Sequence, residues 1–254
     1  MRKLFPLLFC LLLSPSWSQP LHPLVQNNDL TRVSERLEAE KAEAKEGAVR
    51  LVDQRVNQAT PLHIACFVGN QRMVDLLLSY GADLEAVDLL GDSPLFRAFS
   101  EGHSELGVHL VERGAELDRT NKSGETPFMM AARSATGEVL KTLIPKESDL
   151  DRVDGRGRSA LHHAVEGKAS GNVQLLLQAG AAVNLADGAG STVLHKAVSM
   201  GNTELIAALM SAGADLSAKD GRGRSAERIA EERGDRSSLR QLRGESESNK
   251  KRRR

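Results

Sequence analysis

Aromatic residues, cysteines and long apolar runs are all scarce in this sequence. Phe, Trp and Tyr make up 3% of its 254 residues, so leucine and alanine must supply most of any core. The apolar run Leu4–Leu13 is too short to cross a membrane, and no other segment approaches the roughly 18 apolar residues that a spanning helix needs. The two cysteines are Cys10, within that run, and Cys66, which we expect to be a buried and unreactive thiol.

The sequence motifs of common enzyme classes are also missing. There is no G-x-S-x-G nucleophile elbow, no P-loop and no dinucleotide-binding fingerprint after a strand. The histidines include no helical H-x-x-x-H pair and have no cysteine partner, which argues against a zinc site. We therefore predict no enzymatic activity and no bound metal or cofactor.

Charge is balanced overall but uneven along the chain. There are 34 basic and 34 acidic residues, and seven of the basic ones are Arg2, Lys3 and the tail 250–254. The remainder is acidic, whereas a nucleic-acid-binding surface is basic. We therefore predict no nucleic acid partner, and a disordered, solvated tail over residues 244–254.

The N-terminal segment 1–18 has the composition of a secretory signal peptide. Arg2 and Lys3 precede the apolar run, and the Ser-Trp-Ser sequence that ends at Ser18 places small residues at the cleavage positions. Removal of residues 1–18 would leave a mature chain that starts near Gln19. It would also leave a single cysteine, so we expect no intrachain disulfide. A secreted location is the resulting prediction.

The rest of the chain repeats with a constant period of 33 residues. An alanine, an Asp or Asn, and a glycine each recur at a fixed position of this period, and periods of 20 to 50 residues are typical of repeat architectures. The register that defines the frame contains Thr60, Ser93, Thr126, Ser159, Thr192 and Ser225.

Each repeat predicts two helices followed by a hairpin. In the first repeat, Thr60 can cap a helix and Pro61 fits its first turn. The apolar run 73–78 forms a second helix, and Gly81 suits the left-handed residue that ends it. The segment 83–92 then reads as an extended arm with a turn. No repeat can bury its apolar faces alone, so the repeats must stack.

These repeats resemble the ankyrin repeat over about residues 27 to 243. The shared motifs are "TPLH" at 60–63, the pair Ala131-Ala132, and "GAD" at 81–83 and 213–215. The resemblance implies an all-α solenoid of helix-turn-helix units with β-hairpin loops, about six 33-residue repeats and polar caps. The expected organisation is a linker (19–26), an N-terminal capping helical segment (27–59) and repeats (60–243).

Three positions depart from the ankyrin pattern. Phe96 and Met129 replace the histidine of the motif, and Glu147 replaces the glycine that ends the second helix. The junction at 143–151 should therefore be the least regular one.

The resemblance also implies where a partner binds. Partners of ankyrin-like stacks usually meet the hairpin tips and the exposed positions of the first helices, which line a concave face. We expect Phe67, Val68, Leu89 and Leu90 to form the apolar centre of the interface, because the fold requires no apolar side chain at their registers. The polar residues predicted to bind the partner around this centre are Ser100, Glu101, Lys122, Arg133, Arg156 and Arg158. By register, the same face includes Glu125, His163, Glu166, Ser199, Met200, Arg222 and Arg224.

The predicted function is binding of another protein by an exported ankyrin-repeat protein that is monomeric when free. With its signal peptide, this chain is most similar to bacterial periplasmic ankyrin proteins, which implies a location in a bacterial periplasm. The same resemblance implies two roles: self-protecting inhibition of a secreted cell-wall hydrolase, or support of an envelope enzyme such as catalase. Two other hypotheses are an enzyme acting on envelope material, disfavoured because no titratable groups converge, and an intracellular scaffold that keeps its N-terminus.

Overall fold

The computed structural model describes residues 20–43, 50–147 and 149–244. The expected signal peptide and most of the expected tail lie outside these residues, so both stay predictions. The chain divides into two compact units, residues 1–89 and residues 90–254. Among the described residues, no helix is long and apolar enough to cross a membrane.

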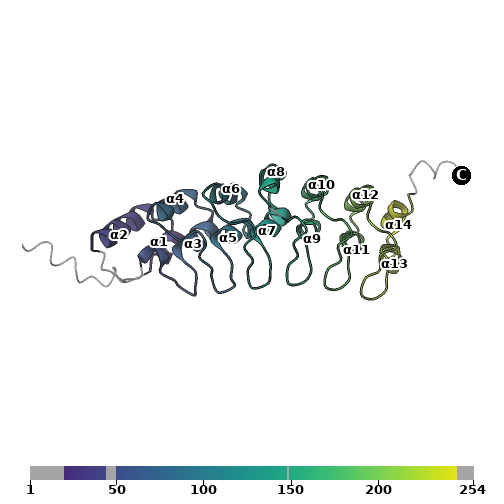
Figure 1. Cartoon of the computed structure of the whole chain (residues 1–254), viewed down its shortest axis with the longest axis horizontal. Helices are drawn as coiled ribbons and strands as arrows, with labels where there is room; N and C mark the ends of the chain where they lie inside the picture. The colour runs from purple at the N-terminus through teal and green to yellow at the C-terminus, as the bar shows by residue number, and fades with distance from the viewer. Residues whose placement is uncertain (1–19, 44–49, 148, 245–254) are drawn as a thin grey trace, which may run out of the picture. The chain divides into compact units, whose positions relative to one another are not determined.

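The first unit contains two pairs of helices (Figure 1). Helix α1 packs against α3, and α2 packs against α4. Its elements are α1 (His22–Gln26), α2 (Leu30–Glu43), the 3-10 helix η3 (Leu51–Asp53), α3 (Pro61–Val68) and α4 (Gln71–Ser79).

The linker expected over residues 19–26 is wrong, because residues 22–26 form α1. Leu21 and Val25 lie one helical turn apart, share one face and are both fully buried. Their burial covers apolar surface that the first repeat would otherwise expose, which is what a terminal cap of a repeat protein must do. The capping segment thus begins before residue 27.

The second unit stacks five helix pairs in two rows (Figure 1). The first helices of the pairs pack on one another in one row, the second helices pack in the other, and the connecting loops project beyond the first row. The pairs are α5 (Pro94–Ser100) with α6 (Ser104–Glu112), α7 (Pro127–Ser134) with α8 (Gly137–Leu143), α9 (Ala160–Glu166) with α10 (Ser170–Gln178), α11 (Val193–Met200) with α12 (Thr203–Ser211), and α13 (Ala226–Glu232) with α14 (Arg236–Leu242).

Each first helix from α3 onward begins at the predicted Ser or Thr, which is its N-cap residue. In α7, the Thr126 hydroxyl accepts a hydrogen bond from the Met129 N–H at 3.2 Å. Such a cap satisfies a backbone donor that has no partner within the helix. The predicted all-α ankyrin-type solenoid is confirmed by these elements.

In α11, the ring of the motif histidine connects the helix start to the next hairpin. Nδ1 of His195 accepts from the Thr192 N–H at 3.1 Å, so Nε2 carries the proton. Nε2 lies 3.1 Å from the carbonyl oxygens of Ala218 and of Arg224, to which it donates. The sequence Thr192-Val193-Leu194-His195 therefore combines a helix cap with a contact between neighbouring repeats.

The hairpin tips of the second unit are joined by backbone hydrogen bonds. The N–H of Gly155 donates to the carbonyl of Ser123 at 2.8 Å, and the N–H of Gly188 donates to the carbonyl of Arg156 at 2.6 Å. In the described chain the hairpins form isolated β-bridges, such as Val153 with Ser159, and no extended strand. The tips thus form an ordered row in which each one is held by its neighbour.

Most second helices end at a left-handed glycine, as predicted. Gly81, Gly114, Gly180 and Gly213 have φ between +79° and +98°. Where Glu147 replaces this glycine, α8 runs instead into the 3-10 helix η4 (Ile144–Lys146). This confirms that 143–151 is an irregular junction.

In the interior, a large side chain on one helix packs against a glycine on the next. Ala131 and Ala164 are fully buried where first helices meet. Phe99 is also fully buried, and its ring occupies the space in front of Gly107, where a Cβ would lie 2.2 Å from a ring carbon. Cys66 is fully buried, and burial raises the pKa of its thiol, in line with an unreactive cysteine.

Candidate protein-binding face

The four predicted apolar residues are exposed. Leu89 is 59% exposed, Leu90 56%, Phe67 51% and Val68 39%. Phe67, Val68 and Leu89 belong to the first unit, with the first two at the end of α3, and Leu90 belongs to the second unit. Their exposure agrees with the expected surface position, while their role in binding stays a prediction.

Most of the predicted polar residues are also at the surface, with one exception. Ser100, Glu101, Lys122, Arg133 and Arg156 are exposed. Among the residues given by register, Ser199 and Arg222 are exposed and Met200 is half-buried. The side chain of Arg158, in contrast, is only 13% exposed. A surface position for Arg158 is therefore wrong, and the reason is a set of ion pairs beneath the tips.

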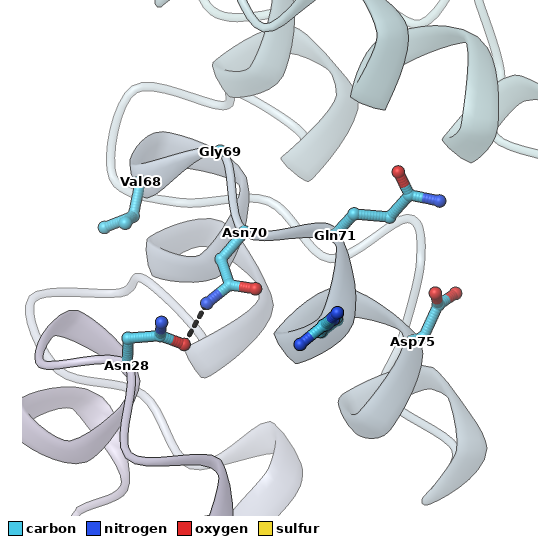
Figure 2. A pocket seen from close by; sticks show the side chains of 7 residues that line it. Asn28, Val68, Gly69, Asn70, Gln71 and Asp75 are labelled. Atoms are coloured by element: carbon cyan, nitrogen blue, oxygen red, sulfur yellow. Dashed lines mark hydrogen bonds between the residues drawn. The ribbon is translucent and has the colours of Figure 1, made fainter.

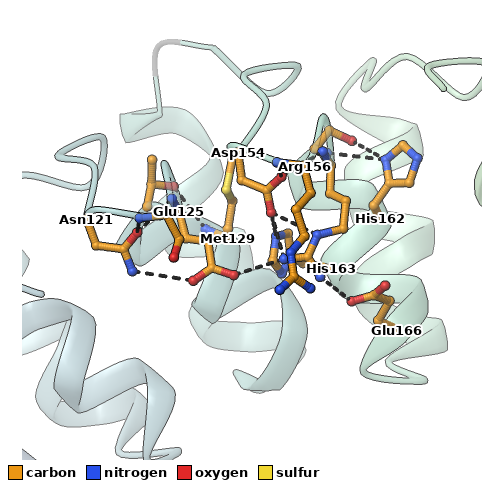
Figure 3. Close-up of polar contacts among 12 residues, drawn as sticks. Asn121, Glu125, Met129, Asp154, Arg156, His162, His163 and Glu166 are labelled. Carbon is orange, nitrogen blue, oxygen red and sulfur yellow. Dashed lines mark hydrogen bonds and ion pairs between the residues drawn. The ribbon is translucent and has the colours of Figure 1, made fainter. Parts of the chain in front are cut away.

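Arg158 is the centre of a polar cluster that spans neighbouring repeats. Figure 3 shows three carboxylate members of this cluster, Glu125, Asp154 and Glu166. Its guanidinium lies 2.7 Å from Oδ2 of Asp154 and 2.9 Å from one carboxylate oxygen each of Glu125 and Glu166. Glu166 in turn pairs with Lys196 of the next repeat at 3.1 Å. Glu125 ends the repeat before that of Arg158. Glu166 belongs to the repeat after it and Lys196 to the one after that, so the cluster joins four successive repeats.

The protonation of this cluster follows from burial and from Arg158. Burial alone would raise the pKa of Asp154, whose side chain is 1% exposed, but hydrogen bonds from the Arg158 and Arg156 backbones and from the Arg158 guanidinium lower it. Burial would likewise raise the pKa of Glu166, and its hydrogen bond with Lys196 lowers it. Both carboxylates are therefore held in the charged form.

His163 belongs to the same cluster and is fully buried, so its expected place on the exposed face is also wrong. Its Nε2 lies 3.1 Å from Oδ2 of Asp154. Burial lowers the pKa of His163, and the positive charge of Arg158 lowers it further. The neutral ring therefore donates to Asp154. Glu125 and Glu166 are half-buried and paired with Arg158 in the same way.

Three of these residues could in principle coordinate a metal ion. One ligand atom each of Glu125, Asp154 and His163 lie within 4.8 Å of one another. The two carboxylates, however, already face the Arg158 guanidinium at hydrogen-bond distance. Since that cation supplies the positive charge that the carboxylates need, the geometry indicates a structural ion-pair cluster.

The hairpin tip 220–224 and helix α13 contain a reduced copy of the cluster, two repeats further along the chain. Arg224 lies 2.8 Å from Asp220 and 3.3 Å from Glu232. Hydrogen bonds from the backbone and then the guanidinium of Arg224 lower the pKa of Asp220 to about 2. Ser191 stands at the register of Glu125, so this copy has one carboxylate fewer and Arg224 is 31% exposed.

The two "DGRGR" motifs therefore give their two arginines different positions. The second arginine, Arg158 or Arg224, folds back onto the aspartate of its own tip. The first, Arg156 or Arg222, is exposed. The repeat period alone could not predict which arginine of each motif is exposed and which forms ion pairs, because both lie in the same loop.

The sequence prediction missed Lys168, which is exposed just after α9. It has φ +57°, a left-handed conformation, at a register where other repeats have Gly69, Gly102 and Gly201. A lysine in a position that favours glycine was the signal that could have identified it.

A shallow groove in the first unit is lined mainly by polar groups (Figure 2). Asn28 and Val68 lie on one side of it and Asp75 on the other, with Asn70 between them. The Asn70 side chain accepts from the Met73 N–H at 3.1 Å and donates to the Asn28 amide oxygen. Both contacts hold helix ends together, so we assign the groove no chemistry.

The comparisons with known proteins agree with this geometry. A sequence profile for ankyrin repeats in three copies matches residues 21–121, 100–187 and 128–220. A comparison with curated proteins finds no match.

Similar solved structures are ankyrin repeat domains. That of Bcl-3, described as a unique member of the IkappaB protein family, is 30% identical over 89% of this chain and 99% of its own, with a TM-score of 0.72. One from Acinetobacter baumannii AYE is 26% identical over 72% of this chain and 96% of its own, with a TM-score of 0.64. The chain therefore belongs to the ankyrin repeat family, whose members are generally non-enzymatic scaffolds that bind other proteins.

Proposed function

We propose that this chain is an exported protein that binds another protein through its hairpin tips and the exposed ends of its first helices. The observation that carries the proposal is the exposure of Phe67, Val68, Leu89 and Leu90. Four of the seven large apolar side chains exposed in the described chain are thus those that the sequence predicts for an interface. Exposed apolar side chains at tips and helix ends favour a partner that covers them.

The export part of the proposal rests on the N-terminal segment 1–18, whose composition is that of a signal peptide. The finer role that we propose is inhibition of a secreted cell-wall hydrolase in the bacterial periplasm, by analogy with exported ankyrin proteins. Support of an envelope enzyme such as catalase is the alternative. An activity assay on the captured partner separates the two, because an inhibitor lowers and a supporting protein raises the partner's activity.

The binding proposal is tested with Phe67→Ala/Leu89→Ala in the mature chain. The partner is first captured from the cell envelope with wild-type protein and identified, and its affinity is then measured by calorimetry. We expect the double variant to lose about 2–4 kcal/mol of binding free energy, as for residues at the centre of an interface. Its melting temperature should stay close to that of wild type, because both side chains are more than half exposed.

Leu216→Ala is the matched control. Leu216 is 43% exposed but lies in the loop after α12, outside the tips and first helices, so its replacement should leave the affinity unchanged. Equal loss in both variants would show non-specific apolar binding. Unchanged affinity of the double variant would place the interface elsewhere.

A further inference from the structure

Between residues 122 and 222, five basic side chains are exposed at the tips and the ends of first helices without an ion pair to any residue that the structure describes. Three lie on hairpin tips and two at the ends of first helices α7 and α9. We name this set the basic face: Lys122, Arg156, Arg222, Arg133 and Lys168.

The backbone of the tips orders this face without using the side chains. The N–H of Arg156 donates to Oδ1 of Asp154 at 2.8 Å, and its carbonyl accepts from Gly188 at 2.6 Å. The N–H of Arg222 donates to Asp220 at 2.9 Å in the same way. The neighbouring Arg158 and Arg224 already pair with these aspartates. The guanidinium groups of Arg156 and Arg222 therefore project from rigid positions and have no structural task.

The ends of α5 and α13 carry exposed acidic residues, Glu101 and Glu232, but the tips and first-helix ends that the structure describes between them do not. Between Lys122 and Gly223, no exposed acidic residue lies on a tip or at the end of α7, α9 or α11. Glu166, at the end of α9, is half-buried and paired with Arg158 and Lys196. The exposed acidic residues of the second helices are on the other row: Glu105, Glu112, Glu138 and Glu204.

We propose that the basic face selects a protein partner with an acidic surface, an inference that rests on the proposed function. Arginine recognises carboxylates with two parallel hydrogen bonds, and a fixed guanidinium loses little entropy when it does so. Arg156 and Arg222 are two repeats apart, or about 20 Å at the usual spacing of packed helices. The face therefore fits a row of carboxylates and is too extended for a single small anion.

A nucleic acid is less suitable than an acidic polypeptide. Proteins that bind single strands combine basic residues with aromatic side chains on which bases stack. The large apolar residues exposed in the described second unit are Leu90, Val153 and Leu216, none of which is aromatic.

The test measures binding of a fluorescent poly-L-glutamate probe to the full mature chain at low and moderate salt. We expect wild-type protein to bind and the affinity to fall as salt rises. Arg156→Ala/Arg222→Ala should weaken binding about tenfold, since each exposed charge pair contributes a factor of about two to five. Melting temperatures are measured alongside, and both residues are exposed enough that no loss of stability is expected.

Lys146→Ala/Arg240→Ala is the matched control. It removes the same charge from exposed positions in η4 and α14, on the second-helix row, and should change the affinity by less than about twofold. Equal weakening in control and test variants would show a general charge effect and overturn the proposal. A single-stranded DNA oligonucleotide that binds as tightly, with the same dependence on Arg156 and Arg222, would also overturn it.

The same variant distinguishes this inference from the proposed function. If the protein captured from the envelope binds the Arg156→Ala/Arg222→Ala variant as tightly as wild type, protein binding stands and the acidic-partner inference fails. If purified mature chain captures no specific protein, the proposed function itself fails.

Discussion

At the scale of single residues, two arginines in one loop have opposite roles. Arg156 is exposed and forms no ion pair with the residues that the structure describes. Arg158 contacts three carboxylates, of which Asp154 is almost fully buried. Removing a partner from a buried ion pair is costly because an uncompensated charge remains, whereas an exposed unpaired side chain contributes little to stability.

Arg158→Ala should therefore lower the free energy of unfolding by about 2–4 kcal/mol. The loss arises from the desolvated carboxylate of Asp154, whose pKa should rise once the guanidinium is gone. Urea unfolding followed by circular dichroism measures the change. Arg156→Ala serves as the control and should cost less than about 0.5 kcal/mol. Similar midpoints for the two variants would contradict the assignment of Arg158 to a buried cluster.

At the scale of elements, helices α5 and α6 pack a large residue, Phe99, against the smallest one, Gly107. The repeat two frames later has Val165 and Val173 at the registers of Phe99 and Gly107, and both valines are fully buried. In the α5–α6 pair a large ring faces a glycine, and in the α9–α10 pair two medium side chains share the space. The two arrangements solve one packing problem at similar total volume.

A double-mutant cycle tests this exchange. Gly107→Val should destabilise by about 1–3 kcal/mol, because its side chain would overlap the Phe99 ring. Phe99→Val should also destabilise, by about 1–3 kcal/mol, because it leaves a cavity. The double variant recreates the Val165–Val173 pair and should be more stable than the sum of the single effects by about 1 kcal/mol or more, measured by urea unfolding. Strictly additive effects would show that the two positions do not share one space.

At the scale of the whole molecule, the proposed export would decide where a partner is met. The charged start, short apolar run and Ser-Trp-Ser sequence predict removal of residues 1–18. N-terminal sequencing of protein isolated from its native host should therefore start near Gln19. An intact Met1 on protein recovered from the cytoplasm would contradict export and favour the intracellular scaffold. Replacing Leu8 and Leu11 with Arg should block processing, because the apolar core of the signal would be lost.

Much of the fold can be predicted from the sequence because its signals are local. The caps at Thr126 and Thr192 bond within the first helical turn, and Gly213 ends its helix by its own left-handed φ. Such features recur once per frame, so the repeat period alone locates every first helix from α3 onward. The exposure of Phe67 and Leu89 follows from the same register.

The contacts between repeats, in contrast, are determined only by the tertiary structure. The sequence does not separate Arg156 from Arg158, because burial of Arg158 depends on Glu125, which belongs to the preceding frame of the chain. It does not show that residues 22–26 fold as a helix, because α1 is stabilised by packing on α3 rather than by its own short length. The repeating pattern determines where the helices of each repeat begin and end, because those signals lie within the repeat. The burial and charge state of an individual side chain depend instead on the neighbouring repeats that surround it.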